Sequence, residues 1–255
     1  MMRPTERFSS RVDDYARYRP DYPAAAIELL TARCGLAPTA VVADIGSGTG
    51  ILTERLLASG AQVFAVEPND GMRAAAESRL GGHERFRSVR GTAEATTLPD
   101  ASIDLLLAAQ AFHWFDVQRA RREALRVMRA GAWAVLLWNE RPVEASAFLA
   151  DYEGLLLRHA ADYARITASR ADEAGMREFF GGPMEVAAFP NQQILDFAGL
   201  KGRLLSSSYA PEAGHPQFEP MMRGLQQLFS RHERGGSIVF PYRTLVYFAQ
   251  PDRSA

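Results

Sequence analysis

The residues best suited to chemistry lie in one glycine-rich stretch, residues 41–50, which reads VVADIGSGTG. An apolar, β-favouring run reaches the acid Asp44, and Gly46, Gly48 and Gly50 then follow at alternate positions. Glycine allows positive φ angles, and it lacks the Cβ atom that would block a ligand. The stretch therefore predicts a buried strand followed by a tight turn that a ligand can approach closely.

A second acid, Glu67, closes the next apolar run, residues 63–66. An acid at the tip of the second strand can accept hydrogen bonds from both hydroxyls of a ribose. The two acids together predict a nucleoside-containing cofactor at the carboxyl ends of a parallel sheet. A dinucleotide fingerprint would need Gly or Ala at position 51, where Ile51 stands, so a nucleotide-linked oxidoreductase is a weaker alternative.

Alternating strand and helix patterns surround this stretch and would position it. Strands are expected at 41–45, 62–66, 86–90, 103–109 and 132–138, and helices at 8–18, 24–34, 51–58, 73–80 and 119–128. After Asn139 the alternation stops. A charged helical stretch at 142–182 follows, then a strand at 185–194, helices at 195–207 and 221–232, and a last strand at 238–249. Pro241 suggests that this last strand has an edge or end position.

The pattern Asp-x-Gly-x-Gly-x-Gly at residues 44–50 resembles the first motif of the class I S-adenosylmethionine (SAM) dependent methyltransferases. The acid, polar turn and methionine at residues 67–72 match the second motif of that family. Residues 18–23, YRPDYP, are similar to a segment of many small-molecule methyltransferases, including the type 11 and trans-aconitate methyltransferase-like groups. The chain departs from the family at Thr92, where many relatives carry Asp, and at residues 130–132, where Pro-Gly-Gly is usual.

The resemblance implies a Rossmann-like methyltransferase fold: a doubly wound α/β protein with a mostly parallel seven-stranded sheet, helices on both faces and a terminal antiparallel hairpin. It implies transfer of a methyl group from SAM to a small-molecule acceptor with an oxygen, nitrogen or carboxylate nucleophile, leaving S-adenosylhomocysteine (SAH). A SAM-binding or regulatory protein without turnover is the alternative. The cofactor-binding residues that the resemblance implies are Asp44, Gly46, Ser47, Gly48, Gly50, Glu67, Pro68, Met72, Thr92, Ala93, Glu94 and Gln110.

The acceptor pocket is expected just past the strand at 103–109, because ligands bind outside the carboxyl ends of strands in such sheets. His113 lies there in an aromatic cluster and could act as a general base, or could only order its neighbours. Candidate substrate-binding residues are Tyr15, Tyr18, Arg19, Phe112, His113 and Trp114. We expect one domain over residues 1–255, with a lid at 8–23, or a plain structural cap there, and a helical cap insertion at about 142–182.

Composition and charge exclude several classes of binding partner from our expectations. The net charge is −1 and no block of basic residues occurs, so nucleic acid is not an expected partner. No apolar run approaches the roughly 20 residues needed to span a bilayer, so no membrane partner is expected. Cys34 is the only cysteine, which fits a reducing cytoplasm. His159 has no partner at ligand spacing, so no metal site is expected. The acceptor's identity and the oligomeric state stay open.

Overall fold

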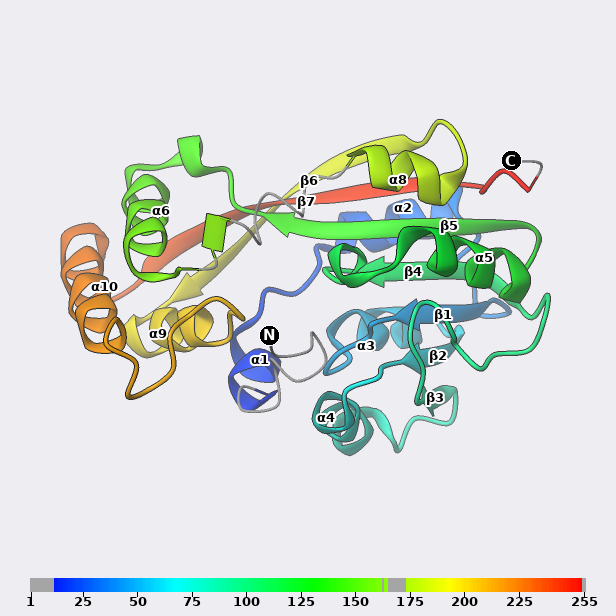
Figure 1. Ribbon diagram of the computed structural model, residues 1–255, viewed down its shortest axis with the longest axis horizontal. Coiled ribbons are helices and arrows are strands. Elements are labelled where there is room, and N and C mark those ends of the chain that lie inside the picture. The colour runs from blue at the N-terminus through cyan, green and yellow to red at the C-terminus, as the bar shows by residue number, and fades with distance from the viewer. Residues whose placement is uncertain (1–11, 162, 165–172, 254–255) are drawn as a thin grey trace.

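The computed structural model describes residues 12–161, 163–164 and 173–253. Within these residues, seven strands form one sheet in the order β3-β2-β1-β4-β5-β7-β6 (Figure 1). The strands β1 to β5 are parallel, and β7 runs antiparallel to both of its neighbours. This topology confirms the predicted fold class. The strands are β1 (Val41–Ile45), β2 (Gln62–Val66), β3 (Phe86–Val89), β4 (Ile103–Ala109), β5 (Met128–Glu140), β6 (Glu185–Leu195) and β7 (Ile238–Ala249).

Helices cover both faces of the sheet, because the central strands are apolar on both sides. In β4, Leu105 and Leu107 pack in one buried cluster, and Leu106 and Ala108 pack in the cluster on the opposite face. The first cluster also holds apolar residues of α2 (Ala24–Arg33), α3 (Ile51–Ala58) and α4 (Asp70–Leu80), and the second holds those of α5 (Val117–Val127) and α8 (Glu173–Phe180).

The strands β6 and β7 continue as a two-stranded ribbon beyond the end of β5. The pairing of β5 with β7 stops at Glu140 and Arg243, whereas β6 pairs with β7 as far as Ile238. Pro241 therefore has a neighbouring strand on one side only. The prediction allowed an edge or an end position for this strand: β7 is not an edge strand, because it lies between β5 and β6, and Pro241 occupies its half-paired end.

Three helices pack on this ribbon and form a second layer, visible at the left of Figure 1. They are α6 (Ala147–His159), α9 (Phe197–Leu205) and α10 (Phe218–His232), and their apolar side chains share one buried cluster with Phe240 and Tyr242 of β7. The second layer thus draws on three separate parts of the chain, of which the expected insertion at about 142–182 supplies only α6.

The structure divides that expected insertion. Its later helix, α8, packs on α5 through Met176, Phe179 and Phe180 and covers a face of the sheet. The spacing of these three residues puts them on one side of a helix, which accounts for their burial against the sheet. Residues 162 and 165–172 lie outside the described residues.

The N-terminal helix α1 (Val12–Tyr18) lies between the second layer and the helices that cover the sheet. It contacts α9 of the second layer and α4 beside the sheet (Figure 1). The segment that follows is held to the sheet by its backbone. The carbonyl of Asp21 accepts hydrogen bonds from the side-chain amides of Asn139 and Asn191, at 3.2 and 2.7 Å. Residues 8–11 of the expected lid lie outside the described residues.

Candidate functional site

Two adjoining cavities open at the carboxyl ends of β1, β2 and β4. Tyr15, Gly46, Ala109 and Gln110 line both of them. The larger cavity has a volume of about 220 Å³ and the smaller about 30 Å³. A ligand that passes between the four shared residues would occupy both spaces, so we treat them as two parts of one site.

The larger cavity brings together most of the residues predicted to bind a cofactor. Gly46 and Gly48 have positive φ angles of 68° and 57° in the turn after β1. A Cβ atom at Gly48 would lie 3.6 Å from Met72 Sδ and 3.8 Å from Tyr15 Cε1, two other residues of the cavity wall. The remaining residues around this cavity are Glu67, Pro68, Asn69, Thr92, Ala93, Glu94, Ala109, Gln110, Ala111, Trp114 and Phe115.

Glu67 joins the two turns that flank the larger cavity. Its carboxylate accepts hydrogen bonds from the backbone N–H of Gly48 at 2.9 Å and of Asn69 at 2.8 Å. Each carboxylate oxygen can accept a second hydrogen bond, so the group still has capacity for a ligand. Glu67 is 8% exposed, and burial raises the pKa of its carboxyl group, opposed by the two backbone hydrogen bonds.

Asn69 also positions Met72. Its side chain accepts a hydrogen bond from the backbone N–H of Met72 at 2.9 Å and so caps the first turn of α4. This cap places the buried Met72 side chain on the cavity wall. The sequence signal for Asn69 was present, since an Asn three residues before Met72 at a helix start is a capping pattern.

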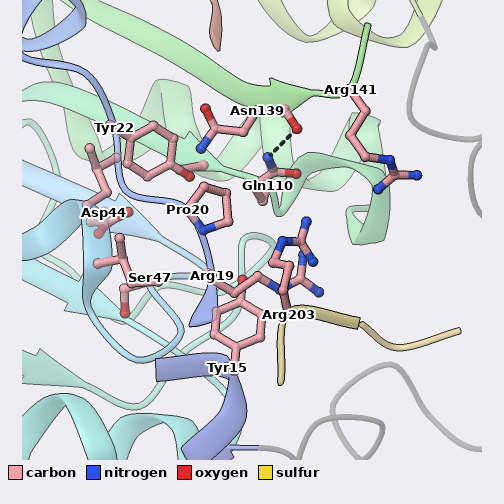
Figure 2. A pocket seen from close by; sticks show the side chains of 14 residues that line it. Tyr15, Arg19, Pro20, Tyr22, Asp44, Ser47, Gln110, Asn139, Arg141 and Arg203 are labelled. Carbon is pink, nitrogen blue, oxygen red and sulfur yellow. Dashed lines mark hydrogen bonds between the residues drawn. The ribbon is translucent and has the colours of Figure 1, made fainter. Parts of the chain in front are cut away.

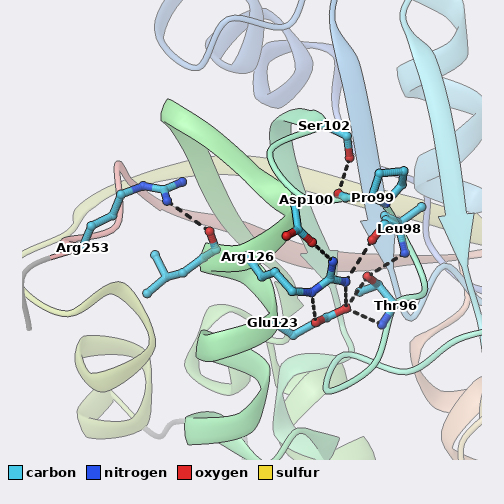
Figure 3. Close-up of polar contacts among 9 residues, drawn as sticks. Thr96, Leu98, Pro99, Asp100, Ser102, Glu123, Arg126 and Arg253 are labelled. Atoms are coloured by element: carbon cyan, nitrogen blue, oxygen red, sulfur yellow. Dashed lines mark hydrogen bonds and ion pairs between the residues drawn. The ribbon is translucent and has the colours of Figure 1, made fainter.

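Hydrogen bonds from α5 hold the loop that contains residues 92–94. Glu123 accepts hydrogen bonds from the backbone N–H and the hydroxyl of Thr96, at 2.7 and 2.6 Å. Arg126 pairs with Glu123 and donates to the carbonyl of Leu98 at 2.9 Å, as Figure 3 shows. The hydrogen bond from Arg126 is the largest cause that lowers the pKa of Glu123, to about 2.

Glu94, one of the predicted cofactor-binding residues, lines the larger cavity and also has a backbone partner. Its Oε1 accepts a hydrogen bond from the backbone N–H of Asp116 at 2.9 Å, just before α5 begins. Asp116 in turn caps α5 by accepting from the N–H of Arg119. Glu94 therefore lines the cavity and also fixes the start of the helix that follows it.

The smaller cavity holds the buried carboxylate of Asp44. One oxygen of Asp44 accepts a hydrogen bond from the hydroxyl of Thr53 at 2.6 Å, and Oδ1 has no partner among the described residues. The hydroxyl of Ser47, also in this cavity, is buried and likewise without a partner among them. Burial raises the pKa of Asp44 to about 7, although the Thr53 hydrogen bond opposes that shift.

Three arginines line the far side of the smaller cavity. Figure 2 shows the guanidinium groups of Arg19, Arg141 and Arg203 on one side, and Asp44 and Ser47 on the other. Arg19 donates to the carbonyl of Ser206 at 2.8 Å, and its guanidinium lies 4.7 Å from the centre of the Tyr15 ring. The sequence interpretation included Arg19 but missed Arg141 and Arg203, together with the cavity residues Pro20, Tyr22 and Asn139.

Several predicted site residues lie elsewhere in the structure. The ring of Tyr18 packs directly on the backbone of Gly202 in α9, which has no side chain in the way. Phe112 is 4% exposed and packs on Phe115, Trp138 and Phe179. Neither residue lines either cavity.

Gly50 also lies outside both cavities. Its φ angle is 84°, and a Cβ atom there would lie 2.8 Å from Leu80 Cδ1 in α4. The third glycine of the turn thus allows α3 and α4 to pack closely. It does not line the wall that a cofactor would meet.

His113 lines neither cavity. It lies in the short 3-10 helix η2 (Phe112–Trp114), and its ring centre is 4.6 Å from that of Trp114. Consecutive residues of a 3-10 turn point in directions about 120° apart. Trp114 consequently faces the larger cavity while Phe112 faces the core and His113 faces neither.

Two findings bear on other kinds of site. Within residues 12–161, 163–164 and 173–253, no three His, Cys, Asp or Glu side chains gather closely enough to hold a metal ion. No helix of this part of the chain has the length and apolar character needed to cross a membrane.

Comparisons with known proteins agree with this geometry. Residues 43–136 match a family model described as a methyltransferase domain. An uncharacterized methyltransferase of Mycobacterium tuberculosis is 42% identical over 138 residues, which are 52% of this chain and 52% of that protein. This chain therefore spans about half the length of the mycobacterial relatives that it matches.

Two further comparisons extend over nearly the whole chain. An uncharacterized methyltransferase-like protein of Schizosaccharomyces pombe is 26% identical over 252 residues, 96% of this chain and 95% of that protein. A solved structure from Anaeromyxobacter dehalogenans, assigned as a type II methyltransferase, has a TM-score of 0.60 at 25% identity and covers 91% of this chain and 96% of that chain.

Proposed function

We propose that this chain is a class I methyltransferase that transfers a methyl group from SAM to a small-molecule acceptor. The observation that carries the proposal is a pair of buried acids at the ends of adjacent strands. Asp44 and Glu67 both face the cavities, and both have oxygens able to accept further hydrogen bonds.

The cavity residues fit SAM. The unpartnered Oδ1 of Asp44 would accept from the cofactor's amino group, and Glu67 would accept from the ribose hydroxyls. Met72 would lie against the adenine, with Thr92 and Ala93 near its edge. Arg19 lines the same cavity as Asp44 and would pair with the cofactor's carboxylate.

When bound, SAM supplies a methyl group on a positively charged sulfur, and the electrons of the broken carbon–sulfur bond leave on a neutral thioether. The protein's contribution is to align the acceptor in line with that bond and to exclude water, which together can lower the barrier by several kcal/mol. A general base is needed only where the acceptor must lose a proton.

The two cavities differ in the elements that form their walls, and both sets of walls are suited to aligning an acceptor with the cofactor. Glu67 holds the turn after β1, and Glu123 and Arg126 hold the loop at 92–98, so hydrogen bonds fix both walls of the larger cavity. On the acceptor side, residues of α1, β5 and α9 meet around the smaller cavity. The acceptor would enter between the sheet and the second layer.

The decisive experiment begins with mass spectrometry of the purified protein under native conditions, followed by calorimetric titration with SAH. We expect bound SAM or SAH, or SAH binding to the emptied protein. Incubation with labelled SAM and a fractionated metabolite pool should then give SAH and one labelled product. A protein that binds nicotinamide nucleotides and does not bind SAH would overturn the proposal.

A SAM-binding protein without turnover is the second candidate. The observation that favours it is the position of His113, the one predicted base, outside both cavities. Formation of SAH that depends on an added metabolite excludes this candidate, whereas tight SAH binding with no transfer to any fraction supports it.

We also propose that residues 8–23 act as a lid, together with a cap formed largely by α6, α9 and α10. Tyr15 lines both cavities, and Gln193 of β6 donates to the carbonyl of Tyr18 at 3.1 Å, so the described part of this segment bridges the two layers. Hydrogen exchange over residues 12–23 should slow when SAH is added. Unchanged exchange there would identify the segment as a plain structural cap.

A further inference from the structure

Two arginines from different layers of the fold bring their guanidinium groups to the smaller cavity. Arg141 follows the end of β5, and Arg203 lies in α9 of the second layer. Arg203 is 4% exposed, and the side chain of Arg141 is 10% exposed. Arginines are rarely so buried unless an anion or a set of acceptors accompanies them.

The partners of Arg203 are neutral. Its Nε donates to the hydroxyl of Tyr242 at 2.8 Å and its Nη1 to the hydroxyl of Ser207 at 3.2 Å. Its guanidinium carbon lies 5.7 Å from the centre of the Tyr242 ring. Among the described residues, no carboxylate comes within ion-pair distance of Arg203, and Nη2 has no acceptor.

Arg141 shares a single acid with a tyrosine. Its Nη2 donates to the hydroxyl of Tyr163 at 2.6 Å, and that hydroxyl donates to Glu153 at 2.7 Å. The Arg141–Glu153 separation itself is 3.6 Å. Its Nη1 donates to the hydroxyl of Tyr209 at 3.2 Å. Glu153 is thus the one carboxylate that the described residues place beside either guanidinium.

The tyrosines cannot supply the missing negative charge. Burial raises the pKa of Tyr163 to about 12, and it also raises the pKa of Tyr242, so both hydroxyls stay neutral near pH 7. They satisfy donor groups and hold the two guanidiniums in place. Among the residues that the structure describes, the two buried guanidiniums therefore face one acid, Glu153.

An uncompensated buried charge is costly, and a bound anion removes that cost. A guanidinium offers paired N–H donors that match a carboxylate or phosphate group. In our assignment of the cofactor, Asp44 and Arg19 are already used by its amino and carboxylate groups. The remaining anion must therefore come from the other ligand of the site.

We propose that Arg141 and Arg203 bind an anionic group, a carboxylate or a phosphate, of the methyl acceptor. This inference rests on the proposed function, because it identifies the chemical class of the acceptor of that same site. The anionic group would enter between the end of β5 and α9 and would orient the acceptor toward the cofactor.

The test uses small anions as probes and SAH to fill the cofactor side. Acetate, inorganic phosphate and the neutral analogue acetamide are each titrated into the SAH complex at constant ionic strength, and the melting temperature is followed. We expect acetate or phosphate to raise it by about 2 °C or more at tenfold excess over its Kd, and acetamide to have no effect. Which anion acts distinguishes a carboxylate from a phosphate acceptor.

Variants assign the effect to the arginines. Arg203→Met should weaken anion binding at least tenfold while SAH affinity changes less than twofold, and Arg203→Lys should lie between. Arg122→Met, at an exposed position of α5, is the matched control and should leave both affinities unchanged.

Several results would overturn the inference. These are no effect of either anion on the wild type, binding of anions only in the absence of SAH, or a tenfold loss of SAH affinity in Arg203→Met. The last two would assign the arginines to the cofactor. The wild-type titrations remain decisive if the Met variant does not fold. Failure of the wild type to bind SAH would instead contradict the proposed function.

Discussion

The strongest prediction concerns the pH dependence of cofactor binding, because Asp44 must be ionised to pair with the amino group. Burial raises the pKa of Asp44 to about 7 in the protein without ligand. At pH 6 only about 9% of the molecules would carry the charge, and at pH 8 about 91%. A positively charged amine favours the ionised form, so binding should draw the proton off Asp44.

The expected magnitude follows from these fractions. The affinity for SAH, whose amine stays protonated over this range, should rise about tenfold from pH 6 to pH 8 and change little above pH 8. At pH 7 about half of the free protein is protonated at Asp44, so each binding event should release about half a proton. Calorimetry in buffers of different ionisation enthalpy measures both quantities.

Asp44→Asn is the matched control, since it keeps the shape and cannot ionise. It should bind SAH roughly 10- to 100-fold more weakly at pH 8, the cost of one charge-assisted hydrogen bond. The pKa of Glu67 is also raised by burial, so the difference between wild type and variant isolates Asp44. Equal wild-type affinities at pH 6 and pH 8, with no proton released, would refute the reasoning.

Four further predictions test other parts of the site. Glu67→Gln should lower SAH affinity at least tenfold, because a hydrogen bond to a charged acceptor contributes about 1.5–3 kcal/mol; unchanged affinity by calorimetry would exclude Glu67 as the ribose partner. Glu123→Gln tests the loop anchor. The pKa of Glu123 is lower in the fold than in the unfolded chain, so its ionised form stabilises the protein above about pH 4.5, and about 2 kcal/mol of this should be lost between pH 6 and pH 3. Urea unfolding should show this loss in the wild type and not in the variant. Gly50→Ala should lower the free energy of unfolding by about 2 kcal/mol, because alanine is strained at a left-handed φ and its Cβ would contact Leu80, while the folded protein keeps its SAH affinity. Weaker SAH binding at unchanged stability would show that Gly50 contacts the cofactor. His113→Asn should bind SAH normally and transfer methyl groups at nearly the wild-type rate, whereas a loss of about 10²-fold would identify His113 as the base.

The second layer shows why the insertion at 142–182 was interpreted too simply. Its length and helical spacing are visible in the sequence, but α6 and α8 go to different layers. Which layer a helix joins depends on the apolar surface that it packs against. For α6 that surface comes from β7, α9 and α10, which all lie later in the chain.

The sequence by itself determined the part of the site to which we assign the cofactor. Asp44, Gly46, Gly48 and Glu67 stand at fixed distances from strands with strong apolar patterns, and parallel strands bring their carboxyl ends to one edge. Local spacing is enough to specify such a turn, because the residues that shape it are neighbours along the chain.

Only the tertiary structure decided the part of the site to which we assign the acceptor. Arg141 and Arg203 are 62 positions apart in numbering (203 minus 141), and neither lies in a motif. Both line the smaller cavity because the β6–β7 ribbon extends past the end of β5 and α9 packs on that ribbon. An arginine side chain normally projects into solvent. No local sequence pattern predicts that these two arginines are buried. Long-range packing therefore determines which side chains line the smaller cavity, and the same packing placed Tyr18, Phe112 and His113 outside both cavities.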